Sequence, residues 1–175
     1  GKLSFAAISG KYRITASFDN EYLKVESLNA AGDYFNLQAD GTGAMWIIGE
    51  NVGKPNIANG PGWNDKNSLC MPSIGNKKFQ ITLVAGKSIT ATSINFKFFG
   101  DKLNWGQEYK NDRLSTTSDL IFVGAGESPG PGDNERDPGN LGLLKDKTLE
   151  VGATYVFTID MSAGNNNAVL TVIKK

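Results

Sequence analysis

The chain has 175 residues, enough for one domain with a sizeable core, and its 39% hydrophobic and 21% charged residues are an ordinary globular composition. Its 18 basic residues balance 18 acidic ones, and no basic stripe runs along the chain, so nucleic acid is not an expected partner. The absence of histidine excludes His-dependent catalytic triads and His-ligated zinc sites.

Cys70 is the single cysteine, so no internal disulfide and no cysteine-rich metal site is possible. Its neighbours in NSLCMPSIG are uncharged, which predicts a buried, unreactive thiol. The sequence shows no signal peptide and no apolar run of about 18 residues, so no transmembrane segment is expected. Because it begins with Gly1, a signal or lipid anchor could lie outside it. We expect no cofactor and no metal.

Alternating apolar and polar residues recur along the chain. They are clearest in residues 11–18 (KYRITASF), 79–84 (FQITLV), 154–161 (TYVFTIDM) and 168–173 (AVLTVI). This period of two, between stretches rich in Gly, Asn, Asp and Ser, predicts half-buried antiparallel strands and hairpins. No segment has an apolar stripe at helical spacing. We therefore predict an all-β fold, an immunoglobulin-like antiparallel β-sandwich of about eight or nine strands with two long loops.

Residues 1–40 are predicted to form an N-terminal β hairpin, and residues 41–175 the β-sandwich itself. The first segment contains GKYRIT followed by LKV, which resembles GATYVFT followed by LTV at the end of the chain. Two alternatives remain for this hairpin. It is either the end of a preceding repeat or an extension of the sandwich.

Two long loops interrupt the strands, at residues 49–72 and 124–140. Loops of this length in compact domains are usually either functional or disordered. Trp63 points the first loop toward function, whereas the second contains no aromatic residue and its role stays open. Within the second, DNERD at 133–137 lacks the acidic spacing and central glycine of a calcium loop, which favours a solvated acidic segment.

The strand predicted over residues 94–99 (INFKFF) has apolar residues on one side and Lys97 on the other, and Trp105 follows just after its turn. A pyranose ring can stack on an exposed indole while a lysine donates hydrogen bonds to its hydroxyls. The alternative is that Trp105 covers the edge of the sandwich and Lys97 is merely solvated. Tyr109 is either part of the same platform or a rim residue. Trp46, within AMWIIG, is expected to be packed.

The order of these features resembles a known group of modules. A strand ending in Ile-Gly, a loop with Gly-Trp, the Phe-Lys-Phe-Phe strand, a turn and a tryptophan are similar to the glycogen- and starch-binding β-sandwich modules, such as that of the AMP-activated kinase β subunit. The likeness is greater to the repeated modules of SusE and SusF, surface starch-binding lipoproteins of Bacteroidetes. It covers roughly residues 45–110 and 147–173.

This resemblance implies that Trp63, Lys97 and Trp105 match the loop tryptophan, the strand lysine and the tryptophan after the turn, which line one face and bind α-glucans. It also implies an outer-membrane, cell-surface location through a lipid anchor outside this sequence. The partners would then be a polysaccharide or oligosaccharide and other surface glycan-uptake proteins. Two departures affect the ligand: the loop before Trp63 is longer, and KSITATS at 87–93 lengthens the approach to the lysine strand.

These observations predict a non-catalytic carbohydrate-binding module with ligand-binding residues Trp63, Lys97, Trp105 and Tyr109. The alternative is a structural spacer or protein-interaction β-sandwich with buried tryptophans. A glycoside hydrolase is a third alternative. Such an enzyme needs two carboxylates placed across the sugar. Acidic residues do lie near the proposed platform, but none is set in an apolar stretch that would favour acid catalysis: Asp101, Glu108, Asp112 and Asp119.

Overall fold

The computed structural model describes residues 7–19, 22–126 and 136–175, and this part of the chain is mostly β with no α-helix. Its strands are β1 (Lys11–Ser17), β2 (Tyr22–Leu28), β3 (Ala44–Glu50), β4 (Leu69–Gly75), β5 (Lys78–Val84), β6 (Asn95–Phe99), β7 (Leu114–Thr116), β8 (Ile121–Val123), β9 (Leu141–Leu143), β10 (Thr154–Asp160) and β11 (Ala168–Lys174). Three short 3₁₀ helices lie between them: η1 (Ile57–Asn59), η2 (Asp65–Asn67) and η3 (Trp105–Gln107).

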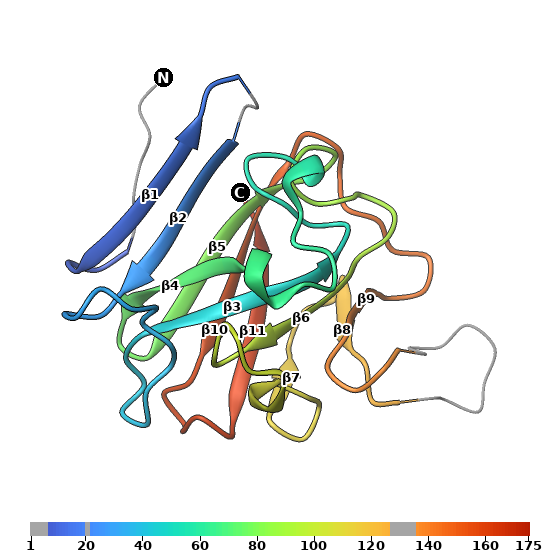
Figure 1. Ribbon diagram of the computed structural model, residues 1–175. Helices are drawn as coiled ribbons and strands as arrows, with labels where there is room; N and C mark the ends of the chain where they lie inside the picture. The colour runs from blue at the N-terminus through green and yellow to red at the C-terminus, as the bar shows by residue number, and fades with distance from the viewer. Residues whose placement is uncertain (1–6, 20–21, 127–135) are drawn as a thin grey trace.

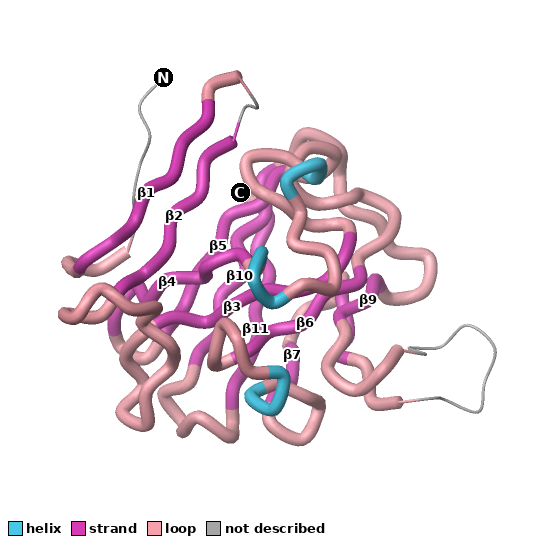
Figure 2. Tube along the Cα trace, viewed as in Figure 1, coloured by secondary structure: helices cyan, strands magenta, loops and turns pink. Residues whose placement is uncertain are grey.

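The main sheet contains seven strands in the order β6-β3-β4-β5-β10-β11-β7 (Figure 1). Its pairs are antiparallel except for β11 and β7, which run parallel. Figure 2 shows that this sheet curls into a half-barrel. Two separate two-stranded sheets, β1-β2 and β8-β9, flank it. No helix in the described ranges has the length and apolar character needed to cross a membrane.

The all-β prediction is confirmed, but the arrangement of the strands differs from the predicted sandwich of eight or nine strands. The described residues form 11 strands, several of them only three residues long, and one curled sheet of seven strands takes the place of two facing sheets. A shift of register between Ser73 and Gly75, where β4 meets β5, adds to the natural twist. Strong twist lets a single sheet wrap around its own core.

The sheet has apolar residues on both faces. One face holds the main core, in which Phe96 packs against Phe157 with ring centroids 6.1 Å apart. The opposite face of β3 and β6 holds a smaller set, the outer cluster, formed by Ala44, Trp46, Ile48 and Phe99. Trp46 is fully buried there, as expected from its strand. The loops of the candidate site pack against the outer cluster.

The hairpin β1-β2 forms as predicted for residues 11–18. Its apolar side is nevertheless open, because Ile14 is 67% and Phe18 is 94% exposed. The opposite, charged side faces the rest of the molecule, where Glu26 lies 3.6 Å from the Nζ of Lys102. The division of the chain at residue 40 stays a prediction. Of the predicted loop at 124–140, residues 127–135 lie outside the described part, and with them most of DNERD.

Candidate functional site

Residues 100–108 form a closed loop after β6, which we name the Trp105 loop. Two backbone hydrogen bonds close it: Gly100 N–H donates to Gln107 O (2.9 Å), and Tyr109 N–H donates to Phe98 O (2.9 Å). Within it, the side chain of Asn104 caps η3 by accepting from Gly106 N–H at 2.9 Å. The loop therefore has a defined backbone rather than an open excursion.

Trp105 is half exposed on this loop. Its indole packs edge-on against the buried ring of Phe99, with centroids 5.3 Å apart and planes at 81°. The remaining 46% of the residue surface faces solvent. Edge-to-face packing of this kind holds an aromatic ring in place while leaving a face accessible. Trp105 is thus held in place and partly exposed, and its predicted role in binding a ligand stays a prediction.

The sequence predicted that Lys97 faces solvent, but the structure places it in a nearly buried position. It is only 9% exposed and forms an ion pair with Glu108, whose second oxygen lies 3.2 Å from the Nζ of Lys110. The cause is the return of the Trp105 loop, because Glu108 pairs with Phe99 and so lies over the polar side of β6. Lys97 therefore has little capacity left for a ligand and instead binds the end of the loop to its strand.

Tyr109 is also displaced from its predicted role. The ring is fully buried in the main core and its hydroxyl lies 3.9 Å from the sulfur of Met161, so it offers no ring face to a ligand. Burial raises the pKa of Tyr109, and the charge of Arg113 opposes that rise. The guanidinium of Arg113 stacks over this ring at 4.2 Å from its centroid. Tyr109 thus supports a cation instead of contacting solvent.

Trp63 lies on the other side of β3 from β6. The preceding residue, Gly62, accepts a 2.8 Å hydrogen bond from Gly49 N–H of β3, and Trp63 itself is 40% exposed. The next residue, Asn64, caps η2. No ring contact joins Trp63 to Trp105 within the described ranges. The two exposed tryptophans are carried by separate loops.

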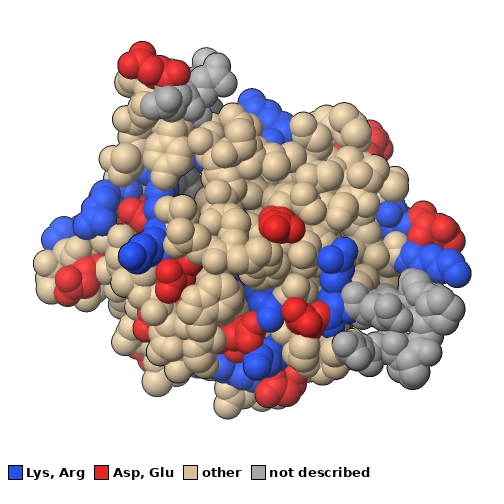
Figure 3. All heavy atoms as spheres, turned by 45° about the vertical axis from the view of Figure 1, so that its right-hand side comes forward, with Lys and Arg blue, Asp and Glu red and all other residues tan. Residues whose placement is uncertain are grey.

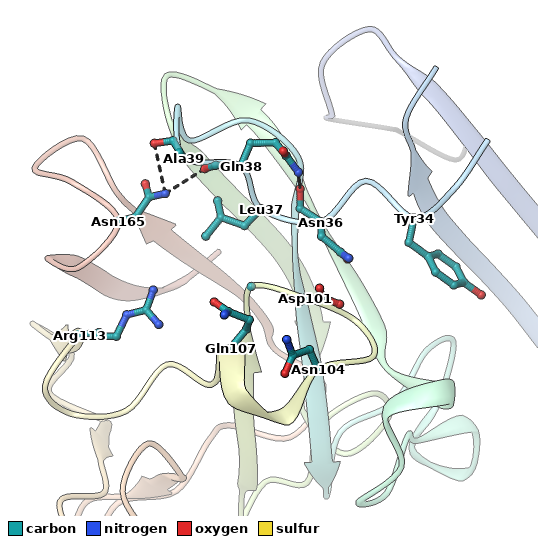
Figure 4. A pocket seen from close by; sticks show the side chains of 11 residues that line it. Tyr34, Asn36, Leu37, Gln38, Ala39, Asp101, Asn104, Gln107, Arg113 and Asn165 are labelled. Atoms are coloured by element: carbon teal, nitrogen blue, oxygen red, sulfur yellow. Dashed lines mark hydrogen bonds between the residues drawn. The ribbon is translucent and has the colours of Figure 1, made fainter. Parts of the chain in front are cut away.

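A cavity of about 420 Å³ adjoins the Trp105 loop (Figure 4). This volume falls within the range of roughly 300–1,000 Å³ that small-molecule sites occupy. The wall combines the Trp105 loop with the segment after β2 and with two distant positions, Arg113 and Asn165. Its polar side chains are mostly amides: Asn36, Gln38, Asn104, Gln107 and Asn165, together with Asp101 and Arg113.

Several of these groups are held by the backbone on one side only. Asn165 Nδ2 donates to Gln38 O at 2.9 Å, and Asp101 Oδ1 accepts from Leu103 N–H at 3.0 Å. Asn36 Oδ1 accepts from Lys102 N–H at 3.1 Å. The side chain of Gln107 has no partner among the described residues. Positioned amides with unused donors and acceptors suit a ligand rich in hydroxyl groups.

Sequence reasoning missed this cavity. Its wall comes from chain segments that lie far apart, such as Asn36, Gln107 and Asn165, and each of these residues alone looks like ordinary loop composition. A partial signal existed for Gln107, which lies two residues after Trp105. Only the fold brings the other segments beside it.

Lys102 anchors the start of the Trp105 loop. Its fully buried Nζ donates to Lys66 O (2.8 Å) and Ser68 Oγ (3.0 Å), and it lies 5.2 Å from the Trp46 ring centroid. Burial, followed by the charge of Lys24, lowers the pKa of Lys102 to about 8. Nearby, burial raises the pKa of the Cys70 thiol to about 12, as expected for an unreactive thiol.

Charges elsewhere define no metal centre. In residues 7–19, 22–126 and 136–175, no group of three or more Cys, Asp or Glu side chains is arranged to hold a metal ion. Figure 3 shows basic and acidic side chains interspersed over one face of the molecule, without a continuous basic surface. The candidate site is therefore the cavity beside the Trp105 loop.

The model of one protein family, described as a domain of unknown function (DUF5121), matches residues 40–162. No curated protein and no solved structure matches the chain. The matched range contains both exposed tryptophans and the part of the cavity wall that comes from the Trp105 loop and Arg113. It excludes the hairpin β1-β2 and the rest of the wall, which is formed by Tyr34, residues 36–39 and Asn165.

Proposed function

Because this chain belongs to the DUF5121 family, which is described only as a domain of unknown function, we propose its function from its own side chains: it is a non-catalytic carbohydrate-binding module. One observation carries the proposal. An exposed, rigidly packed tryptophan, Trp105, is part of the same loop that supplies Asn104 and Gln107 to an amide-lined cavity.

This combination matches the two kinds of surface on a sugar. The C–H face of a pyranose ring stacks on an indole, while its hydroxyls take hydrogen bonds from planar amides and carboxylates. Because Lys97 and Lys102 hold the loop from both ends, little ordering is needed on binding. A single stacked ring contributes about 1 kcal/mol beyond area burial, so single-site affinity is weak and linked copies would strengthen it.

The finer parts of the proposal rest on the resemblance to the SusE and SusF modules. That resemblance supports an immunoglobulin-like origin for the sheet, an α-glucan-type ligand, and a place among lipid-anchored glycan-uptake proteins of the outer membrane. Trp63 is proposed as a second, separate platform. Lys97 acts by positioning the Trp105 loop, and Tyr109 by supporting Arg113.

The absence of catalysis is part of the proposal. Hydrolysis of a glycosidic bond needs two carboxyl groups on opposite sides of the sugar. Among the described residues that line the cavity, Asp101 alone is acidic. Both oxygens of Glu108, the next carboxylate along the loop, are engaged by lysines. Release of reducing sugar from a glycan that binds would contradict this part.

Substitution Trp105→Ala tests the proposal. We expect glycan affinity to fall at least about tenfold, because stacking area and quadrupole contact are both lost. The melting temperature should fall by no more than about 5 °C, since the ring is half exposed. A glycan array identifies a ligand, and affinity electrophoresis in gels containing that glycan compares the variants.

Phe18→Ala is the matched control, because Phe18 is an aromatic residue exposed on the hairpin, away from the cavity. It should leave glycan retention unchanged. Retention unaffected by Trp105→Ala, or a collapse of the melting temperature, would contradict the proposal. Trp63→Ala in the same gels measures the contribution of the second loop.

A protein-interaction module is the second candidate function. The observation in its favour is an exposed apolar surface on the hairpin, formed by Ile14 of β1 and by Phe18, which follows β1. The same pair of variants separates the two functions. If Phe18→Ala changes self-association or partner capture while no glycan binds, the interaction function holds and the carbohydrate function fails.

A further inference from the structure

We propose that the cavity beside the Trp105 loop selects a sugar that carries a carboxylate, and that Arg113 binds this carboxylate. The inference rests on the proposed carbohydrate function and adds the class of ligand to it. It starts from a cation in the cavity wall that has no carboxylate partner in the part of the chain that the structure describes.

Arg113 is firmly positioned. Its guanidinium stacks on the buried ring of Tyr109, 4.2 Å from the centroid. Its backbone is held at both ends, because Arg113 N–H donates to Lys110 O at 3.0 Å and Arg113 O accepts from Ala168 N–H at 2.9 Å. A guanidinium held in this way is already oriented for a ligand, so little side-chain entropy is lost on binding.

The charge of Arg113 has no carboxylate partner among the described residues. The neighbouring cations do have one: Lys97 and Lys110 pair with Glu108, and Lys24 and Lys102 pair with Glu26. The Nε–H of Arg113 is buried, and no described residue accepts a hydrogen bond from it. A partly buried cation without a counter-ion is costly, and this cost falls when a ligand supplies the negative charge.

The cavity is polarised along its length. Figure 4 shows Arg113 on the side of Asn165, whereas Asp101 lies on the opposite side with Tyr34. No ion pair joins Arg113 to Asp101 across it within the described part of the chain. A sugar carboxylate would therefore be attracted at one end and repelled at the other. This fixes its direction, with hydroxyls toward Asp101.

The carboxylate is favoured by shape as well as by charge. The planar guanidinium presents parallel N–H donors that match the two oxygens of a carboxylate. Next to it, Asn165 uses its Nδ2 on the backbone of Gln38 and keeps its oxygen as an acceptor for a sugar hydroxyl. Gln107 adds an uncommitted amide. Together these groups fit a uronic acid residue.

The test uses the intact chain and pairs of matched oligosaccharides. Oligomers of galacturonate and of glucuronate are titrated by isothermal calorimetry beside their counterparts in which every carboxyl group has been reduced to a primary alcohol. We expect the acidic form to bind about tenfold more tightly, the effect of one charge-assisted hydrogen-bonded pair. Arg113→Gln should remove this preference, because it weakens binding of the acidic form far more than binding of the reduced, neutral form.

Two further variants make the result specific. Lys87→Gln removes one positive charge at an exposed turn outside the cavity wall, and it should keep the preference. Arg113→Lys keeps the charge but loses the planar fork, and it should keep only part of the preference. This variant decides the question even if Arg113→Gln folds poorly in a thermal melt.

Three results would overturn the inference. The first is equal affinity for the acidic and reduced forms. The second is an equal loss of affinity for both forms in Arg113→Gln, and the third is tighter binding of a sulfated oligosaccharide than of either uronate. Binding of neutral glycans without an acid preference would leave the carbohydrate function standing. Failure of every glycan to bind would remove both proposals.

Discussion

Lys97 shows how a single buried side chain can hold the loop that bears an exposed tryptophan. It is nearly buried on the polar side of β6 and is held by Glu108, which also binds Lys110. Glu108 belongs to the loop that bears Trp105, so the ion pair fixes where the indole lies. The lysine within an otherwise apolar strand is thus explained by the return of its own loop.

The variant Glu108→Gln tests this positioning role. It leaves Lys97 buried with no carboxylate, so we expect a loss of about 3 kcal/mol in the free energy of unfolding. Glycan affinity should fall in parallel, although Glu108 does not line the cavity. Urea denaturation and affinity electrophoresis measure the two effects. The double variant Lys97→Met with Glu108→Gln should recover most of the stability, and no recovery would contradict the role.

An ion pair also joins two neighbouring strands of the main sheet. Lys78 on β5 and Asp160 on β10 are direct cross-strand partners, with Nζ and Oδ2 2.8 Å apart. The hydrogen bond from Lys78, followed by the one from Ser162 N–H, lowers the pKa of Asp160 to about 2. This pair ties the edge of the β5-β10 ladder next to the turn that follows β10.

The lowered pKa predicts a specific acid dependence of stability. In the unfolded chain Asp160 titrates near 3.8, and in the folded chain near 2. Its stabilising effect is therefore present above the unfolded value and is lost as the pH falls toward the folded one. In thermal melts from pH 5 to about 2, Asp160→Asn should weaken the dependence of the melting temperature on pH. The effect should be modest because the pair is partly exposed.

A matched control is Asp112→Asn, which removes an exposed carboxylate that forms no ion pair within the described ranges. It should leave the acid dependence as in the natural chain. If the stability of Asp160→Asn depended on acid pH in the same way as that of the natural chain, the cross-strand pair would contribute nothing to folding.

For the chain as a whole, Lys102 is the point where separate segments meet. Its Nζ contacts Glu26 of the hairpin β1-β2, the backbone of η2, and Ser68 before β4. It also lies over the rings of Tyr34 and Trp46. The hairpin, the Trp63-bearing loop and the Trp105 loop are therefore joined through one buried ammonium group.

This arrangement predicts an alkaline effect of unusual sign. The pKa of Lys102 is about 8 in the folded chain and 10.5 in the unfolded chain. Between these values the unfolded state holds the extra proton, so raising the pH favours the folded state. Relative to Lys102→Met, the natural chain should thus gain stability from pH 8 to pH 10.5.

Urea unfolding of both proteins at a series of pH values measures this difference, and the subtraction cancels the titration of other groups. Lys24→Met serves as the control, because Lys24 is the second cause of the lowered pKa of Lys102. It should reduce the difference without removing it. A difference that is constant with pH would contradict a buried, titrating Lys102.

The strands were largely predictable. Residues 79–84, 154–161 and 168–173 agree with β5, β10 and β11 to within one or two residues. Exposure of Trp105 was also predicted correctly. Both follow from local pattern, because alternation sets which side chains share a face, and a bulky indole after a tight turn has few places to pack.

The surroundings of Lys97, Tyr109 and Arg113 were decided only by the tertiary structure. Alternation places Lys97 on the polar side of its strand, but it does not say that Glu108 returns to cover that side. Likewise, Tyr109 is buried and Arg113 reaches a cavity because distant segments close around them. The sequence by itself therefore determined the strands and the exposed aromatic. The cavity beside it was decided by the tertiary structure, because contacts between segments far apart in the chain leave no local periodicity.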